Sequence, residues 1–441
     1  AIRERQDRLE HTAREARVRH GTDNGMIDRQ FIGTITLPLE LREAITRTLA
    51  HYPRKQLREQ AALLSEQLRA RTRVHPRDLD SGEVPVEGRE AVVYDEGAVQ
   101  AYVAYRLPAV YACTSRVFGE LAAHHRDSFR PRNMLDFGSG PGTTVWSARD
   151  SWPSLEAVLR VEPSLAMNIA AQRLLTYLPK PELEVLTRRT LGDGLDANAR
   201  FDLVVASYAM TELQDIAERK RTVRTLWKHV KPGGMLIIVE PGTPVGFGAI
   251  REARTALLED KMLSPIDQPR VLGPCPHAAV CPMSRQSFCH FPQRLHRTEQ
   301  LSRSKSGITS SLAPSGKGQD PTRPHSKSTA KVASFEDEKY SYVALGKGSE
   351  FADAPAPSIA PAAASSQTES ERKSRIIEAP AKRGGHVLLK VCSPRGQIER
   401  HTVSRSTGKL IYKSARKARW SDLILADARS FKEMLPSEYE S

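Results

Sequence analysis

The sequence predicts an α/β fold in which helices cover both faces of a doubly wound, mostly parallel sheet. After residue 133, short apolar segments alternate with longer helical ones, which is the pattern of successive strand–helix units. A glycine-rich turn follows the first apolar segment, and the second ends on an acidic residue, Glu162. Both features fall at the carboxyl ends of strands, where Rossmann-like sheets bind their ligands.

The chain before this sheet is predicted to be helical. Apolar residues recur at helical spacing from Leu37 to Thr72, and Pro53 divides them into two helices. A longer helix is predicted from Gly97 to His125, with a kink at Pro108. We therefore expect a helical N-terminal region over residues 1–94 and a sheet domain over residues 95–272.

The sheet domain is predicted to contain five strands, each short and rich in apolar residues. They are Met134–Phe137, Val158–Glu162, Glu184–Leu186, Phe201–Ala206 and Met235–Glu240. A helix from Phe247 to Met262 is expected to complete the domain.

The turn after the first strand has the sequence Leu135-Asp136-Phe137-Gly138-Ser139-Gly140-Pro141-Gly142. Its glycine spacing is tighter than the dinucleotide fingerprint and is typical of S-adenosylmethionine sites, although a plain strand-to-helix turn can look similar. The candidate cofactor-binding residues are Asp136, Gly138, Ser139, Gly140 and Gly142, with Glu162 and Asp193 after the second and third strands. The sequence thus predicts a Rossmann-like sheet of the class I methyltransferase type.

The sequence contains no recognisable motif for methyl transfer. Ser207-Tyr208-Ala209-Met210 follows the fourth strand, where an amino-group methyltransferase would carry an Asn/Asp-Pro-Pro-aromatic tetrad. A methyltransferase acting on a pyrimidine carbon would need a nucleophilic cysteine near that strand end. Because neither is present, no catalytic residue is assigned, and the expected pocket could bind S-adenosylmethionine without transferring its methyl group.

Four of the five cysteines form the most distinctive pattern in the chain. They are Cys275, Cys281 and Cys289, within one loop, and Cys392 far downstream. Prolines and histidines crowd the loop, which makes buried free cysteines a weak explanation, and soft thiolates select zinc, Cu(I) or an iron–sulfur cluster. The spacing is not that of a zinc ribbon and favours a cluster, but His277 and His290 leave a Cys/His zinc site open.

A strong positive charge indicates a polyanionic partner. The net charge is +14 and the pI is near 9.6, which favours nucleic acid, with an anionic membrane surface as the alternative. No apolar run approaches the ~18 residues that a membrane helix requires, so no membrane span is expected.

The positive charge is concentrated near the C-terminus, where residues 372–419 carry fourteen Lys or Arg and two acidic residues. A hairpin is predicted there from His386–Val391 and Gln397–Val403. In a methyltransferase-type sheet the final hairpin returns beside the fifth strand, so Cys392, at the end of the first hairpin strand, is expected to reach the cysteine loop. We expect this region to bind the phosphates of RNA. The candidate contacts are Lys382, Arg383, Arg416, Lys417 and Arg419.

The remaining boundaries follow composition. We expect a cysteine-rich metal loop at residues 273–297 and a strand continuing the sheet at 335–347. Residues 298–334 and 348–371 are rich in small and polar residues and are expected to be low-complexity insertions. Residues 372–441 form the basic C-terminal hairpin and tail.

These motifs together resemble the methyltransferase-like family associated with assembly of the mitochondrial small ribosomal subunit. The resemblance spans roughly residues 95–297 and 335–425. It is carried by Tyr105-Arg106-Leu107-Pro108-Ala109, the Asp136–Gly142 turn, Ser207-Tyr208 with Glu212-Leu213, Glu240-Pro241-Gly242-Thr243-Pro244, the loop ending in Cys289-His290-Phe291, and Lys382-Arg383-Gly384-Gly385-His386.

The resemblance implies a 4Fe–4S cluster on Cys275, Cys281, Cys289 and Cys392, with zinc as the alternative. It also implies contact with small-subunit rRNA and with mitochondrial ribosomal proteins or assembly factors, in the mitochondrial matrix. The expected function is that of a small-subunit assembly factor that binds rRNA. Two alternatives stay open: an active S-adenosylmethionine-dependent rRNA methyltransferase, and a constitutive mitoribosomal protein.

Overall fold

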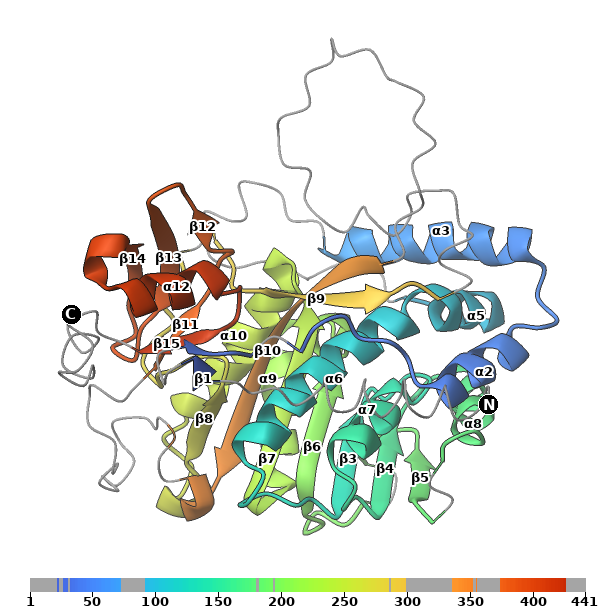
Figure 1. The fold of residues 1–441 in the computed structure, drawn as a ribbon. Coiled ribbons are helices and arrows are strands. Elements are labelled where there is room, and N and C mark those ends of the chain that lie inside the picture. Colours follow the sequence, from blue (N-terminus) through green and yellow to red (C-terminus); the bar gives the residue numbers. More distant parts are fainter. Residues whose placement is uncertain are drawn as a thin grey trace, which may run out of the picture.

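A computed structural model describes most of the chain as two bodies that lie side by side (Figure 1). The described residues are 22–23, 27–30, 32–72, 92–179, 182–192, 195–284, 287–298, 335–351, 354 and 373–425. The larger body is a sheet with helices on both faces, and the smaller is a second sheet formed mainly by the C-terminal part of the chain.

Eight strands of the described residues form the sheet of the larger body. They are β3 (Asn133–Phe137), β4 (Ala157–Val161), β5 (Glu184–Arg188), β6 (Phe201–Ser207), β7 (Val230–Pro241), β8 (Pro269–Gly273), β9 (Phe291–His296) and β10 (Phe335–Lys347). Parallel strands occur in the order β5-β4-β3-β6-β7, and β10 pairs antiparallel with β7. This order confirms the predicted doubly wound sheet, and its switch point lies between β3 and β6.

Helices cover both faces of the sheet. Successive side chains along a strand point to opposite faces, so both faces carry apolar residues that the helices bury. In β6, Leu203 and Val205 pack into the core under one set of helices, whereas Val204 and Ala206 pack into the core of the opposite face. The first face carries α2 (Leu39–Thr48), α5 (Glu96–Tyr105), α6 (Leu107–His124), α7 (Thr143–Ser151) and α8 (Leu165–Leu175). The second carries α9 (Ile216–Lys228) and α10 (Pro244–Leu258).

The N-terminal helices follow the predicted pattern with one difference. Pro53 separates α2 from α3 (Arg54–Thr72), as expected, and α3 packs on α5. The single kinked helix predicted around Pro108 is wrong, because the structure has two helices that meet at Arg106. Pro108 lies in the first turn of the second helix, where its missing N–H leaves no hydrogen bond unmade.

The smaller body has its own sheet and core. Its strands are β1 (Thr22–Asp23), β2 (Ile27–Asp28), β11 (Lys373–Ile376), β12 (Ala381–Lys382), β13 (His386–Cys392), β14 (Ile398–Ser404) and β15 (Leu423–Leu425). The amphipathic helix α12 (Lys409–Lys417) contributes Ile411 and Ala415 to its core. We call this unit, with its helix, the C-terminal sheet.

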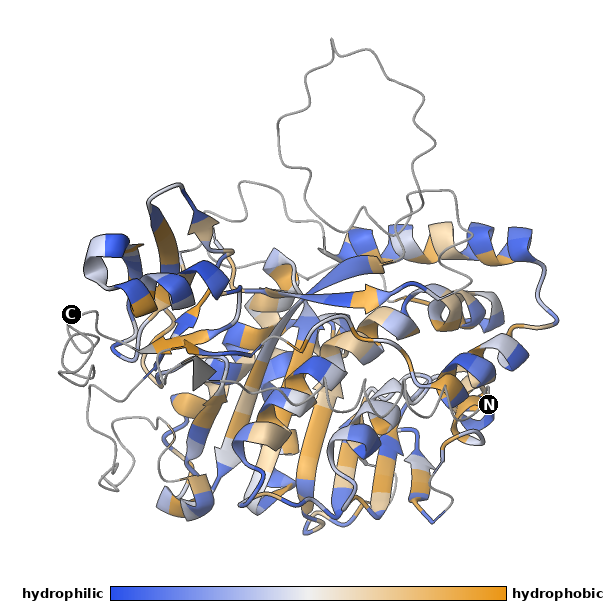
Figure 2. Cartoon of the chain, viewed as in Figure 1, coloured by the Kyte–Doolittle hydropathy of each residue, from blue (hydrophilic) through white to orange (hydrophobic). Residues whose placement is uncertain are grey.

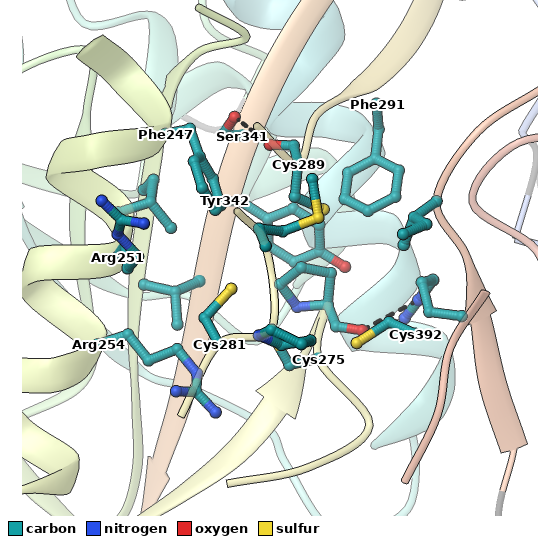
Figure 3. Close-up of a pocket in the computed structure, with 17 residues that line it drawn as sticks. Phe247, Arg251, Arg254, Cys275, Cys281, Cys289, Phe291, Ser341, Tyr342 and Cys392 are labelled. Atoms are coloured by element: carbon teal, nitrogen blue, oxygen red, sulfur yellow. Dashed lines mark hydrogen bonds between the residues drawn. The ribbon is translucent and has the colours of Figure 1, made fainter. Parts of the chain in front are cut away.

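Two expectations are corrected here. The N-terminal region is not wholly helical, since β2 pairs with β15 of the C-terminal sheet. The hairpin β13–β14 was expected to return beside β7, yet β10 occupies that position and the hairpin belongs to the C-terminal sheet. Cys392 nevertheless ends β13, as predicted, and faces the larger body across the junction (Figure 3).

A buried ionic network joins the two bodies. The Glu120 carboxylate on α6 accepts hydrogen bonds from Arg116 at 2.8 Å and from Arg375 of β11 at 2.7 Å. Arg375 also donates to the carbonyl oxygens of Pro274 at 3.1 Å and Ser421 at 2.8 Å. The C-terminal sheet is therefore attached to the larger body through side chains that are almost fully buried.

Hydropathy follows this architecture. Figure 2 shows hydrophobic strands at the centre of the larger body and many hydrophilic residues along α3 and α12. None of the helices in the described ranges has the length and apolar character needed to cross a bilayer.

Candidate functional site

The glycine-rich turn forms the first candidate site, at the carboxyl end of β3. Gly138, Gly140 and Gly142 all have positive φ, from 51° to 80°, which glycine adopts without the strain other residues would incur. A side chain at Gly138 would meet the Cβ atom of Ala209 at 2.5 Å, whereas no atom lies within 4 Å of that position at Gly140. The turn therefore packs tightly at Gly138 against the segment that follows the fourth parallel strand, whereas the space beside Gly140 is free for a ligand.

Acidic residues border this turn. Glu162 directly follows β4, and its carboxylate accepts hydrogen bonds from the backbone N–H groups of Gly140 and Ser164, both at 2.8 Å. Arg160 donates to the carbonyl oxygen of Gly140 at 2.7 Å, so both backbone groups of this glycine are held. The structure therefore brings Asp136, the turn and Glu162 together, as predicted for a cofactor site.

Several buried polar atoms around the turn have no hydrogen-bond partner among the residues that the structure describes. They are both carboxylate oxygens of Asp136 and the hydroxyls of Ser139, Thr143, Ser207 and Tyr208. Burial raises the pKa of Asp136 to about 7, and it also raises the pKa of Glu162. Buried polar groups are normally paired, so these orphaned atoms fit a site that receives a polar ligand with positive charge.

The fourth parallel strand ends in a strained residue. Tyr208 follows β6 with φ of 57°, a conformation that costs free energy for a residue with a side chain and is found most often at functional sites. The guanidinium of Arg106 lies 5.6 Å from the centre of the Tyr208 ring. Nearby, Glu212 accepts a hydrogen bond from the Tyr94 hydroxyl, and burial raises the pKa of Glu212 to about 7.

The four predicted cysteines line one cavity at the junction of the two bodies (Figure 3). Cys275, Cys281 and Cys289 come from the loop between β8 and β9, and Cys392 comes from β13. Apolar side chains and three arginines line much of the remaining wall. The predicted pairing of distant cysteine segments is therefore present in the fold, and all five cysteines of the chain are free thiols.

Cys392 is buried, the other three cysteines of the cavity are partly buried, and the four lie close enough to influence one another. Burial raises the pKa of Cys275, Cys289 and Cys392, and repulsion from neighbouring cysteines adds to this effect. His277 lies beside them, with its Nε2 atom 3.3 Å from the sulfur of Cys392. Within the described ranges, no group of three or more His, Cys, Asp or Glu side chains is arranged to hold a metal ion. The metal site therefore stays a prediction. The residues present fit it, because four thiols line one cavity.

The five candidate RNA contacts share one exposed surface. Lys382 and Arg383 lie at β12, and Arg416, Lys417 and Arg419 lie on or just after α12. Arg416 donates to the carbonyl oxygen of Arg383 at 2.9 Å, which joins the two segments. Partial burial and repulsion from Arg416 and Arg419 lower the pKa of Lys382. We call these five residues the basic surface.

Comparison with known proteins identifies the family. A family model described as "Mitochondrial small ribosomal subunit Rsm22" matches residues 96–312 and 320–425. The chain belongs to the Rsm22 family. The match includes both candidate sites and the basic surface.

Relatives in the Rsm22 family are named as mitochondrial assembly proteins. The human "Ribosome assembly protein METTL17, mitochondrial" is 31% identical over 75% of this chain and 63% of its own length. The Saccharomyces cerevisiae "Ribosome assembly protein RSM22, mitochondrial" is 24% identical over 69% of this chain and 63% of its own length. The chain thus spans less than two thirds of these relatives, whose names agree with the mitochondrial localisation that the resemblance implied.

Solved methyltransferase structures align with parts of the chain at low TM-scores. A ribosomal protein L11 methylase from Lactobacillus delbrueckii aligns with a TM-score of 0.26 and 19% identity, covering 36% of this chain and 72% of that protein. An S-adenosylmethionine-dependent methyltransferase from Clostridium acetobutylicum aligns at 0.24 and 18%, covering 31% and 51%. The methyltransferase-like fold of this Rsm22 protein is assigned from its own strand order, and these structures add nothing on activity.

The sequence did not identify every residue at these sites. Asp193 lies outside the described residues. Arg254 of α10 and Arg375 of β11 line the cysteine cavity but were not predicted. Arg254 could have been noticed, because it lies four residues from Ile250 and four from Leu258, on the apolar stripe of its helix.

The raised pKa of Asp136 predicts a pH dependence of stability. Because its pKa in the folded protein lies near 7, above the ordinary 3.8, its contribution to folding is fully present below about pH 4 and falls as the pH rises toward 7, and the last part of it is lost between pH 6 and pH 8. An Asp136→Asn variant should therefore lose less stability than the wild type between these pH values, by on the order of 1 kcal/mol. Denaturant unfolding at both pH values measures this difference.

The exposed Asp127→Asn substitution is the matched control and should leave the pH dependence unchanged. Equal pH slopes for the wild type and Asp136→Asn would show that the Asp136 carboxyl is ionised normally.

Proposed function

We propose that this chain is an assembly factor of the mitochondrial small ribosomal subunit, acting in the matrix and binding rRNA through a methyltransferase-like scaffold. The family match and the names of the relatives support the ribosomal role. The basic surface supports an RNA partner, because clustered cations with few interleaved aromatic residues bind phosphates rather than read bases. Mitochondrial ribosomal proteins or other assembly factors are the expected protein partners.

The observation that carries the proposal is the position of the four cysteines. Three belong to a loop of the larger body, one belongs to the C-terminal sheet, and all four line one cavity. A 4Fe–4S cluster held by Cys275, Cys281, Cys289 and Cys392 would fasten the basic surface to the scaffold, because formation of a metal site and local folding are one equilibrium. Each cluster thiolate binds a separate iron, so the side chains need not converge on one ion.

The orphaned polar atoms at the glycine-rich turn favour a second role, binding of S-adenosylmethionine. Asp136 and Glu162 would hold its polar groups, and the ligand would supply an activated methyl group. No motif for transfer follows β6, so we propose cofactor binding without assigning a catalytic residue. An active rRNA methyltransferase is the alternative. Loss of one specific rRNA methyl group in a Glu162→Ala strain that still assembles its subunits would establish that alternative.

An assembly factor also differs from a constitutive ribosomal protein in its occupancy. Assembly precursors should contain this chain, and mature translating particles should lack it. Quantification of the chain across a sedimentation gradient of mitochondrial ribosomes separates the two roles, and stoichiometric amounts in mature particles would favour a permanent component.

The cluster assignment predicts metal content and its dependence on one cysteine. Anaerobically purified protein should be brown, with iron and acid-labile sulfide at roughly four each per chain. Cys392→Ala should lose most of this iron and reduce ribosome association. Cys113→Ala is the matched control, because Cys113 is fully buried in α6, away from the cavity, and should retain the metal.

If the purified protein is colourless and contains one zinc ion, zinc occupies the site in place of the cluster, and the proposed fastening role remains. Metal-free protein with four reactive thiols would contradict both.

The basic surface predicts a salt-dependent affinity for RNA. The double substitution Arg416→Ala and Lys417→Ala should weaken binding to a small-subunit rRNA transcript and reduce the slope of log affinity against log salt by roughly 1 per cation. Arg54→Ala with Lys55→Ala, exposed on α3, removes the same charge elsewhere and should change the slope little. Equal losses in the two double variants would show that net charge, and not this surface, determines binding.

A further inference from the structure

Arg254 is a buried cation without an acidic partner. It lies on α10 with 4% of its surface exposed, and no carboxylate of the described residues forms an ion pair with it. One of its guanidinium nitrogens donates to the carbonyl oxygens of His277 at 2.9 Å and Ala279 at 2.8 Å, and its Nε has no partner in the described part of the chain. A buried, uncompensated charge costs several kcal/mol, and an anion beside Arg254 would offset this cost.

The surroundings of Arg254 restrict what that anion can be. Arg254 lines the same cavity as the four cysteines, and no aspartate or glutamate of the described residues lines it. Of the other arginines there, Arg375 has the Glu120 carboxylate as its counter-ion. Figure 3 shows Arg251 and Arg254 on one helix, with Arg254 on the side of Cys275 and Cys281. The thiols are therefore the groups available to supply negative charge to Arg254.

The hydrogen bonds of Arg254 also shape the cysteine loop. The carbonyls of His277 and Ala279 both lie between Cys275 and Cys281. A planar guanidinium that holds two carbonyl groups fixes the path of the backbone between these two cysteines. The same side chain thus provides a positive charge and positions two of the expected ligands.

We propose that Arg254 is the built-in counter-ion and positioning residue of a metal–thiolate centre on the four cysteines. The inference rests on the proposed function, because it requires that these thiols bind metal. Four thiolates with a 4Fe–4S core or with zinc form a dianion, which a buried guanidinium stabilises. For a cluster, net charge and hydrogen bonds to sulfur set the reduction potential, so the positive charge of Arg254 should favour the reduced form.

The test compares Arg254→Gln, Arg254→Lys and Arg251→Gln in the full-length, anaerobically reconstituted protein. Two quantities are measured: the reduction potential by spectroelectrochemical titration, and the rate of metal loss to a chelator. Arg251 is the matched control, because it lines the same cavity and stacks on Phe247 at 5.7 Å but makes no hydrogen bond to the loop within the described part of the chain.

Arg254→Gln should shift the potential to more negative values by on the order of 59 mV, a tenfold change in the one-electron equilibrium, and should release metal several-fold faster. Arg254→Lys should keep a potential near that of the wild type, since it keeps the charge. It should still release metal faster, because the shorter lysine side chain does not place its ammonium where the terminal nitrogen of Arg254 donates to both carbonyls. Arg251→Gln should match the wild type in both measurements.

Equal potentials and equal release rates for Arg254→Gln and Arg251→Gln would overturn the inference while leaving the metal site intact. Wild-type protein that binds neither iron nor zinc would instead overturn the proposed function, and the inference with it. If the wild type binds zinc, the release rates alone decide the outcome. If Arg254→Gln does not fold, Arg254→Lys must still release metal faster than Arg251→Gln, and equal rates would contradict the positioning role.

Discussion

The arrangement of the two bodies depends on the Arg375 guanidinium. It binds Glu120 of the larger body, the Pro274 carbonyl at the start of the cysteine loop and the Ser421 carbonyl of the C-terminal part. A buried ion pair of this kind adds little net stability compared with apolar packing, but loss of one partner is costly because a charge is left buried. The network therefore specifies where the C-terminal sheet docks, and it places β13 so that Cys392 faces the other three cysteines.

Much of the larger body could be predicted because its signals are local. Alternation of apolar strands with helices identified the parallel sheet, and the glycine spacing placed the turn at the end of the first strand. The cysteines were found from composition alone, since thiols crowded among prolines and histidines are unusual in a loop. The structure then placed all four around one cavity, whereas their metal stays a proposal.

The remaining features depend on contacts between distant segments, which local patterns do not encode. β2 is a two-residue strand that pairs with β15, almost four hundred positions later, and no pattern in its sequence predicts this pairing. The predicted position of the β13–β14 hairpin was wrong. Analogy with other sheets of this type favoured a return beside β7, but β10 already pairs with that strand. Glu120, Arg254 and Arg375 carry charges that usually indicate exposed positions. Glu120 and Arg375 are buried because they pair across the junction, and Arg254 is buried against the carbonyls of the cysteine loop.

The central claim is that the cysteine site fastens the basic C-terminal sheet to the scaffold. Hydrogen–deuterium exchange of the metal-loaded and metal-stripped protein, resolved by peptide, tests it most directly. Removal of metal should increase exchange in the cysteine loop and in β11, β13 and β15, while β3, β4 and β6 stay protected. Unchanged protection of the C-terminal sheet without metal, or an equal loss of protection throughout both bodies, would contradict this account.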